Sequence, residues 1–451
     1  MKYLVLFSII IAACTSHPVK KQPSISSAKI PVQQKEIFEK GKVISNIQCK
    51  SNPQESFSFY VPLNYDTAKK NAVIVFFDPH AGAEFVAKKF QHLAEEFNTV
   101  LISSEDSKNG LTQDQTAEIA NTLIAETKNR FAVDDQITLA GFSGGAKVAM
   151  SATSNASVNS LIYCGAVSSI PKKNIGVLGF AGVDDMNYTD LLLFDQSLLN
   201  SVGNHFFIEW KGKHEWVDSA NFRDAFYWLQ FNRMRNHFAA IDSGLIKTFL
   251  TENEKRLSKA QNDFGKVAIN NKIISFLGGL YDVSKYEQAT NQLQQIAAYM
   301  STVEQRQKTL RTETAMKQEY INAFQSKDLN WWKPEIQKLQ SEKDPMHQRL
   351  LGFLSLAGFS ISSNAIQQNN FEVAEKMLAI YKLADPKNSD QPFLEACLFA
   401  QQGKSDLAVL LLQKAVDLGL IDANKILQEP SLQSLKTNDK FIELITKMKS
   451  E

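Results

Sequence analysis

The segment Gly141–Gly145 reads G-F-S-G-G and matches the pattern G-x-S-x-G, in which a serine hydroxyl can act as a nucleophile. It follows the apolar run Ile137–Ala140 and precedes the helix-like run Ala146–Met150. Small residues beside the serine permit a sharp, strained strand-to-helix turn, and the helix start directs N–H groups toward the serine. The sequence therefore predicts Ser143 as a nucleophile, the alternative being a glycine-rich turn without catalysis.

Short β-type runs alternate with helical stretches between residues 40 and 231. The run Val73–Phe77 is continuously apolar, which is typical of a parallel strand covered on both faces. This alternation predicts a doubly wound α/β sheet with helices on both faces. The predicted strands are Val43–Cys49, Ser56–Val61, Ala72–Phe77, Thr99–Ser103, Gln136–Ala140, Leu161–Val167, Gly176–Ala181 and Phe206–Trp210. The predicted helices are Val86–Glu96, Gln113–Arg130, Gly144–Thr153, Asp190–Ser201 and Ser219–Asn232.

Acidic and basic candidates follow the last two predicted strands. Asp184 and Asp185 lie in the turn G-V-D-D, His214 lies in G-K-H-E-W, and the segment Tyr60–Tyr65 reads Y-V-P-L-N-Y. Together with G-x-S-x-G, these residues resemble the α/β-hydrolase superfamily, in particular its small esterase, depolymerase and prolyl-oligopeptidase-like branches. The resemblance covers about residues 40–232.

This resemblance implies a triad in the chain order serine, acid, histidine. Asp185 has the G-x-x-D spacing of the family's acid, and Asp184 is the second choice. His214 is then the general base that takes the Ser143 proton, and Asp185 orients the imidazole and stabilises its protonated form. Both aspartates could instead serve only to cap the turn.

An oxyanion formed at Ser143 requires two backbone N–H donors. Gly144 is the first, because it directly follows the serine. The second should come from the loop after the third strand, which in many relatives reads H-G or H-G-G-G. Here the loop departs from that pattern with Asp78–Gly82, D-P-H-A-G. Ala81 is the preferred donor and His80 remains open, while His80 and Asp184 are also candidates for lining the pocket.

Beyond about residue 235 the β pattern stops and helical patterns continue to the end of the chain. Ala374, Leu378 and Tyr381 recur 34 positions later as Ala408, Leu412 and Ala415. A helical period of this length resembles tetratricopeptide repeats, which implies a concave face that binds a peptide segment. An unrelated helical bundle is the alternative. Trp331-Trp332 is interpreted as a core or inter-domain contact.

The N-terminus resembles a bacterial lipoprotein signal. A basic Met1-Lys2 precedes the apolar run Tyr3–Ala13, which is too short to span a bilayer and ends beside Cys14 in I-A-A-C. The resemblance implies cleavage before Cys14, acylation of its sulfur and, with Thr15 rather than Asp next, an outer-membrane anchor facing the periplasm. An ordinary secretory signal with a chance cysteine is the alternative.

Composition excludes several classes of function. The net charge of +1 over 451 residues gives no electrostatic reason to expect nucleic acid as a partner. The four cysteines and seven histidines show no CxxC or HxxxH spacing, and no phosphate loop or dinucleotide fingerprint occurs. We therefore expect neither a metal nor a cofactor. No apolar segment after the signal is expected to reach membrane-spanning length.

The predicted organisation is a signal peptide (1–13), a lipidated tether (14–40), an α/β-hydrolase domain (41–232), a helical region (233–355) and tetratricopeptide-like repeats (356–451). The predicted function is an envelope serine hydrolase that cleaves a small ester, amide or peptide through an acyl-enzyme. The alternative is a non-catalytic lipoprotein scaffold, which binds a protein or peptide partner through its helical repeats.

Overall fold

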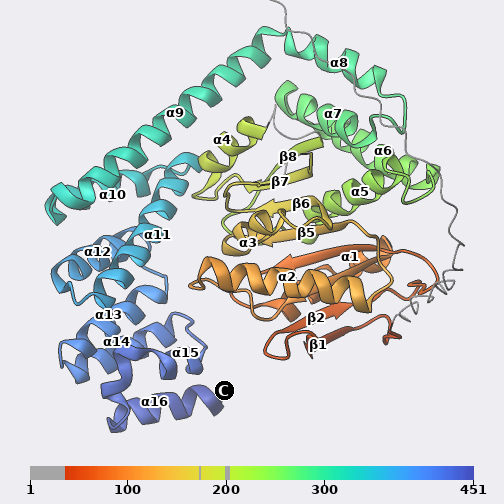
Figure 1. Cartoon of the computed structure of the whole chain (residues 1–451). Coiled ribbons are helices and arrows are strands. Elements are labelled where there is room, and N and C mark those ends of the chain that lie inside the picture. The colour runs from red at the N-terminus through yellow and green to blue at the C-terminus, as the bar shows by residue number, and fades with distance from the viewer. Residues whose placement is uncertain (1–35, 172–173, 199–203, 451) are drawn as a thin grey trace, which may run out of the picture. The chain divides into compact units, whose positions relative to one another are not determined.

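The computed structural model describes residues 36–171, 174–198 and 204–450, and Figure 1 shows the arrangement of its elements. The predicted signal peptide, Cys14 and nearly all of the predicted tether lie outside the described residues. The described chain has an α/β part, which ends with the helix α5 (Ser219–Arg235), and a helical part that follows it.

A single eight-stranded sheet forms the centre of the α/β part, with the strand order β1-β2-β4-β3-β5-β6-β7-β8. Strand β2 is antiparallel to both of its neighbours, and the strands from β4 to β8 are parallel. The strands are β1 (Val43–Gln48), β2 (Ser56–Tyr60), β3 (Ala72–Phe77), β4 (Thr99–Ser104), β5 (Ile137–Phe142), β6 (Val158–Cys164), β7 (Gly176–Gly182) and β8 (Asn204–Trp210). Parallel strands place their carboxyl ends at one edge, where the connecting loops gather.

Alternate residues of β3 enter two different hydrophobic cores. Ile74 and Phe76 pack with helices α1 (Ala83–Glu96) and α5, while Val73, Val75 and Phe77 face the opposite layer. That opposite layer consists of α2 (Gln113–Arg130), α3 (Gly144–Ala152) and α4 (Tyr188–Leu198). Since both faces are covered, the strand reads as an unbroken apolar run. The predicted fold class, an α/β-hydrolase sheet with helices on both faces followed by a helical region, is confirmed.

One predicted strand is displaced. The sequence predicted a strand at Leu161–Val167, whereas β6 runs from Val158 to Cys164. The strand ends there because Gly165 adopts a φ of 71°, which is outside the extended region. Because the local apolar pattern continues to Val167, periodicity alone extended the strand too far.

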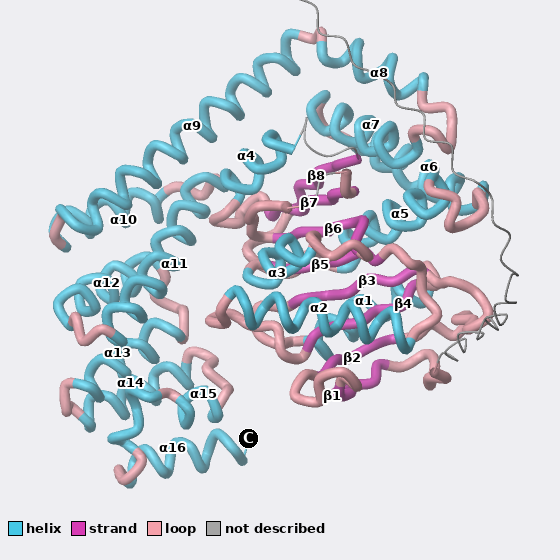
Figure 2. Tube along the Cα trace, viewed as in Figure 1, coloured by secondary structure: helices cyan, strands magenta, loops and turns pink. Residues whose placement is uncertain are grey.

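The helical part consists of regular helices joined by short loops, which Figure 2 distinguishes by colour. The helices are α6 (Ser243–Lys259), α7 (Asp263–Leu277), α8 (Ser284–Gln294), α9 (Ala297–Ser326), α10 (Leu329–Ser341), α11 (Pro345–Gln367), α12 (Phe371–Ala384), α13 (Asp390–Gln401), α14 (Ser405–Asp417), α15 (Ala423–Gln428), the 3₁₀ helix η1 (Pro430–Leu435) and α16 (Asp439–Ser450). Helix α11 packs on α12, and α13 packs on α14.

The residues of the internal repeat occupy matching buried positions on α12 and α14. Ala374, Leu378 and Tyr381 on α12 are each at most 2% exposed, and Ala408, Leu412 and Ala415 on α14 are fully buried. Trp332 is fully buried in the core formed by α9 to α12, in agreement with its interpretation as a core residue. Assignment of these helices to the tetratricopeptide family stays a prediction.

Helix α11 is long and apolar enough to cross a membrane by length and composition, with a mean hydropathy of 1.2. The expectation that no segment beyond the signal reaches this length was therefore wrong. In the structure α11 packs against α9, α10, α12 and α13. A core helix of a soluble protein meets the same criterion, so α11 is weak evidence for a membrane span.

Candidate active site

Ser143 lies at the turn between β5 and α3 with a φ of 51° and a ψ of −120°. A positive φ is strained for a residue with a side chain, so the surrounding structure must hold this conformation. The Ser143 N–H donates to the Cys164 carbonyl of the neighbouring β6 at 2.9 Å. The turn thus directs the hydroxyl away from the sheet at the carboxyl edge, where the loops after β7 and β8 also lie.

Steric contacts explain why glycines occupy the positions around Ser143. A Cβ at Gly145 would lie 2.0 Å from the Phe77 carbonyl oxygen on β3, and a Cβ at Gly141 would lie 2.2 Å from the Gly145 carbonyl oxygen. Since these backbone atoms of β3 and α3 cannot move aside without disturbing their neighbours, only glycine fits at these two positions. The G-x-S-x-G pattern is therefore a packing requirement of this turn.

Ser143, His214 and Asp185 form a continuous chain of hydrogen bonds. The His214 Nε2 atom lies 2.9 Å from the Ser143 Oγ atom, and His214 Nδ1 lies 3.0 and 3.1 Å from the two Asp185 carboxylate oxygens. A carboxylate only accepts hydrogen bonds, so the ring hydrogen belongs on Nδ1, which leaves Nε2 to accept the serine proton. This arrangement is what general-base activation of a serine nucleophile requires.

The loop after β7, Val183–Asn187, supplies the acidic residue and is named the acid loop here. Asp185 is 1% exposed and also accepts the Asn187 N–H at 2.8 Å. Between the two aspartates that the sequence left open, Asp185 is the one that contacts His214. Asp184 is partly exposed, and among the described residues no hydrogen bond joins its carboxylate to His214.

One of the two predicted oxyanion donors is available and the other is not. Gly144 begins α3, so its N–H lacks an intrahelical acceptor, and no carbonyl among the described residues accepts it. By contrast, the Ala81 N–H donates to the Ser107 carbonyl at 2.8 Å. The expectation that Ala81 is the second donor is wrong for this conformation, because its N–H is already bonded to the loop after β4.

Asp78 explains why the Asp78–Gly82 loop departs from the glycine-rich pattern. Its buried Oδ1 accepts the N–H groups of His80 at 2.8 Å and Gly82 at 3.2 Å. Its Oδ2 accepts the indole N–H of Trp216 at 2.7 Å, two residues after His214. Asp78 therefore orders its own loop and ties it to the loop that carries the histidine. Because the His80 N–H already donates to Asp78, it is not free to be the second oxyanion donor.

Asn109, which no sequence motif indicated, lies against the serine turn. A Cβ at Gly144 would lie 1.9 Å from Oδ1 of Asn109, and the Asn109 N–H donates to the Pro79 carbonyl at 2.8 Å. Asn109 thus places a carboxamide in the space that a Gly144 side chain would occupy. Asn109 belongs to an N-G turn after β4. The sequence of that turn does not indicate that its side chain reaches the serine turn. His80 is exposed and forms an isolated bridge with Lys108.

Other reactive groups near the site are not arranged for chemistry. Burial raises the pKa of the Cys164 thiol, with a further contribution from the charge of Asp185, so this buried thiol stays protonated. Among the described residues, no group of three or more His, Cys, Asp or Glu side chains could hold a metal ion.

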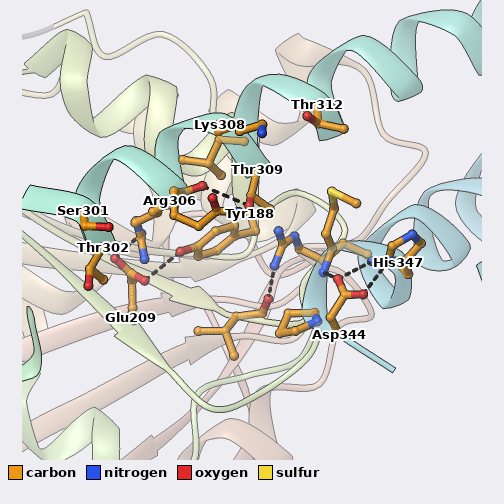
Figure 3. Close-up of a pocket in the computed structure, with 16 residues that line it drawn as sticks. Tyr188, Glu209, Ser301, Thr302, Arg306, Lys308, Thr309, Thr312, Asp344 and His347 are labelled. Atoms are coloured by element: carbon orange, nitrogen blue, oxygen red, sulfur yellow. Dashed lines mark hydrogen bonds and ion pairs between the residues drawn. The ribbon is translucent and has the colours of Figure 1, made fainter. Parts of the chain in front are cut away.

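A cavity of about 960 Å³ has Val183 of the acid loop in its lining (Figure 3). Val183, Tyr188 and Glu209 of the α/β part line it together with residues of α9 and the start of α11. Figure 3 shows Tyr188 and Arg306 both directed at Glu209, with Tyr188 Oη 2.7 Å and Arg306 Nη2 2.6 Å from its carboxylate oxygens. Ser143 and His214 do not line this cavity.

No known family model and no curated protein matches this sequence. Solved structures similar to the α/β part include S-formylglutathione hydrolase from Staphylococcus aureus, with 13% identity and a TM-score of 0.33 over 43% of this chain and 99% of the other. An α/β serine hydrolase without a lid from Xanthomonas campestris has 14% identity and a TM-score of 0.34 over 44% of this chain and 96% of the other.

One similar structure extends over both parts. An uncharacterised protein from Capnocytophaga ochracea has 14% identity and a TM-score of 0.34, covering 91% of this chain and all of the other. At these identities and TM-scores the similarities do not bear on chemistry, so the assignment of a reaction depends on the geometry around Ser143.

Proposed function

We propose that this protein is a serine hydrolase that cleaves an ester or amide bond through an acyl-enzyme on Ser143. The observation that carries the proposal is the position of His214, within 3.1 Å of both the Ser143 hydroxyl and the Asp185 carboxylate. A serine, a histidine and a buried aspartate hydrogen-bonded in this order can perform acyl transfer through the serine.

In the proposed mechanism His214 Nε2 takes the Ser143 proton as Oγ bonds to the substrate carbonyl carbon. The Gly144 N–H stabilises the oxyanion, and Asp185 balances the positive charge on the imidazole. The protonated His214 then gives its proton to the leaving alcohol or amine, and the acyl group remains on Ser143. Water, deprotonated by His214, attacks the acyl carbon and releases the acid with the free serine.

The sequence further leads us to propose that the protein acts in the bacterial envelope and is anchored through a lipid on Cys14. Its substrates would then be small esters, amides or peptides of that compartment. Metabolic labelling with a radioactive fatty acid tests the anchor. The full-length protein should incorporate label, and a Cys14→Ser variant should not; equal labelling of the two would refute the anchor.

A fluorophosphonate probe tests the nucleophile, because it forms a stable bond only with an activated serine. The wild-type protein should be labelled, and Ser143→Ala and His214→Ala should not. Ser154→Ala removes an exposed serine just beyond α3 and should label like the wild type. Labelling of Ser143→Ala at the wild-type rate would overturn the proposal.

A non-catalytic scaffold is the second candidate, and one observation favours it. The N–H groups of His80, Ala81 and Gly82 are all committed to other acceptors, so the loop offers no second oxyanion donor at these residues. If purified wild-type protein is neither labelled by the probe nor active on short acyl esters, the scaffold function is the one to pursue.

A further inference from the structure

Three charged side chains of the helical part form one group, and two of them bind the acid loop. Glu313 and Lys317 lie on α9 and Arg349 lies on α11, and each is at most 8% exposed. Burying three charged groups is costly unless each is paired and hydrogen-bonded. Their partners therefore show what the arrangement holds in place.

The two cations bind backbone carbonyls on either side of Asp185. Arg349 Nη1 donates to the Val183 carbonyl at 2.6 Å, and Lys317 Nζ donates to the Met186 carbonyl at 2.6 Å. Lys317 also donates to the Thr189 hydroxyl at 2.8 Å, at the start of α4. Both carbonyls belong to the loop that carries the triad acid.

Glu313 orients the two cations. Arg349 Nε lies 3.0 Å from each Glu313 carboxylate oxygen, and Lys317 Nζ lies 3.2 Å from Oε1 of the same group. A planar guanidinium bound to a carboxylate has a fixed direction, whereas a lysine alone can rotate. The Arg349 guanidinium also lies 4.5 Å from the centre of the Tyr188 ring. Tyr188 is the residue that directly follows the acid loop.

The acid loop is thus held from two sides by different kinds of group. The α/β part binds its N–H groups: Val183 donates to Trp210 and Asp184 donates to Gly212, each at 2.9 Å. The helical part binds its carbonyls at Val183 and Met186. Neither part alone accounts for both sets of bonds.

We propose that Arg349 and Lys317, oriented by Glu313, are positioning residues for Asp185, so that the helical part completes the support of the active site. This inference depends on the proposed function, in which Asp185 orients His214. It gives the helical part a role in catalysis that requires no contact with substrate. Misplacing a catalytic group by about 1 Å can reduce a rate by roughly 100-fold.

The test compares Arg349→Met with Lys272→Met in the full-length protein. Each substitution removes one of two cations from a buried carboxylate: Glu313 keeps Lys317, and Asp224 keeps Arg256. Lys272 lies on α7 and pairs with α5, where it makes no hydrogen bond to the acid loop. Both variants should lower the stability of the protein. The Lys272→Met control therefore separates the effect of lower stability from the effect of a displaced acid loop.

We expect Arg349→Met to lower kcat on a short acyl ester by roughly 10- to 100-fold with KM within twofold. Hydrogen exchange should become faster at the amides of Val183–Asn187. Arg349→Lys keeps the charge and should recover part of kcat, and Lys272→Met should keep both kcat and the exchange of the acid loop. If Arg349→Met does not fold, Lys317→Met probes the Met186 carbonyl with the same readouts.

Wild-type kcat and unchanged acid-loop exchange in the substituted protein would overturn the inference, leaving Arg349 as a structural contact only. Failure of the proposed function gives a different result: the fluorophosphonate probe would not label wild-type Ser143. In that event the exchange measurement still shows whether the helical part holds the acid loop.

Discussion

The α/β part and the helical part both contain glycines at positions with no room for a Cβ. The structural role of these glycines differs between the two parts. At Gly145 a Cβ would lie 2.0 Å from the Phe77 carbonyl oxygen, beneath a strained serine turn. At Gly358 a Cβ would lie 2.6 Å from the Tyr381 Cβ atom, where α11 crosses α12. The first contact fixes the direction of one side chain, and the second brings two regular helices close together.

The difference teaches where each part can influence chemistry. In the α/β part, backbone packing itself sets the position of Ser143. In the helical part, the charged side chains of Lys317 and Arg349 bind carbonyls of the acid loop, and α11 also packs on Met186 of that loop at Gly352. We therefore expect helix packing away from the acid loop to govern stability, and the groups that touch the acid loop to govern the geometry of the site.

The largest effect is expected from Gly145→Ala. The new methyl group would meet a backbone oxygen of β3, so α3 or the serine turn must shift. Overpacking of this kind costs about 1–3 kcal/mol, and displacement of the serine should lower the rate of probe labelling by roughly 100-fold or more. Stopped-flow or gel-based labelling kinetics and thermal unfolding measure the two effects.

Gly144→Ala is the matched control at the next residue. Its methyl group would meet Oδ1 of Asn109, the end of an exposed side chain that can rotate away. This variant should keep labelling within about tenfold of the wild type, since a side-chain rotation costs far less than a backbone shift. Equal labelling of Gly145→Ala and the wild type would show that the serine turn tolerates movement of β3.

A smaller effect is expected at the link between Asp78 and Trp216. Asp78→Asn retains one carbonyl oxygen, so it can no longer accept from both the loop N–H groups and the indole. We expect kcat/KM to fall about tenfold, because a charge-assisted hydrogen bond contributes about 1.5–3 kcal/mol. Trp216→Phe removes the donor and keeps most of the ring.

The double variant Asp78→Asn/Trp216→Phe distinguishes a direct link from two separate effects. If the bond couples the two loops, the double variant should resemble the single variants, giving a coupling energy above about 1 kcal/mol. Strictly additive losses would indicate that each residue acts on its own loop. Either result refines how the α/β part orders the side of the site opposite the acid loop.

Local patterns were sufficient to locate the sheet and the serine turn. The apolar runs predicted the strands within a few residues, and G-x-S-x-G identified the turn, because both depend on neighbouring residues. Asp185 and His214 could be proposed by family resemblance, since each follows a strand at a recognisable spacing. The structure places His214 in contact with both Asp185 and Ser143.

The rest of the site depends on contacts between distant segments, which a single sequence does not record. The Ala81 N–H turns to Ser107, and Asn109 reaches the serine turn, because of how the loops after β3 and β4 pack together. Arg349 lies 166 positions from the carbonyl that it binds. Its position in an apolar helix gave no sign of this contact with the acid loop.

The smallest effect on activity is expected from Gly358→Ala in the helical part. The added methyl group would meet the Tyr381 Cβ atom at 2.6 Å, so α11 and α12 must separate slightly, at a cost of about 1–3 kcal/mol. We expect α12 to move rather than α11, because Arg349 and the packing on α9 hold α11 on the acid loop. The melting temperature should fall while kcat stays within twofold of the wild type.

Gly265→Ala on α7 is the control, because its Cβ would make only ordinary contact, 3.4 Å from Oδ1 of Asn262. Alanine is favoured over glycine in a helix, so this variant should be as stable as the wild type or slightly more so. Equal stability of the two variants would show that the α11–α12 contact is loose. A fall in kcat for Gly358→Ala would show instead that α11 moved, which would mean that packing as well as charge connects the helical part to Asp185.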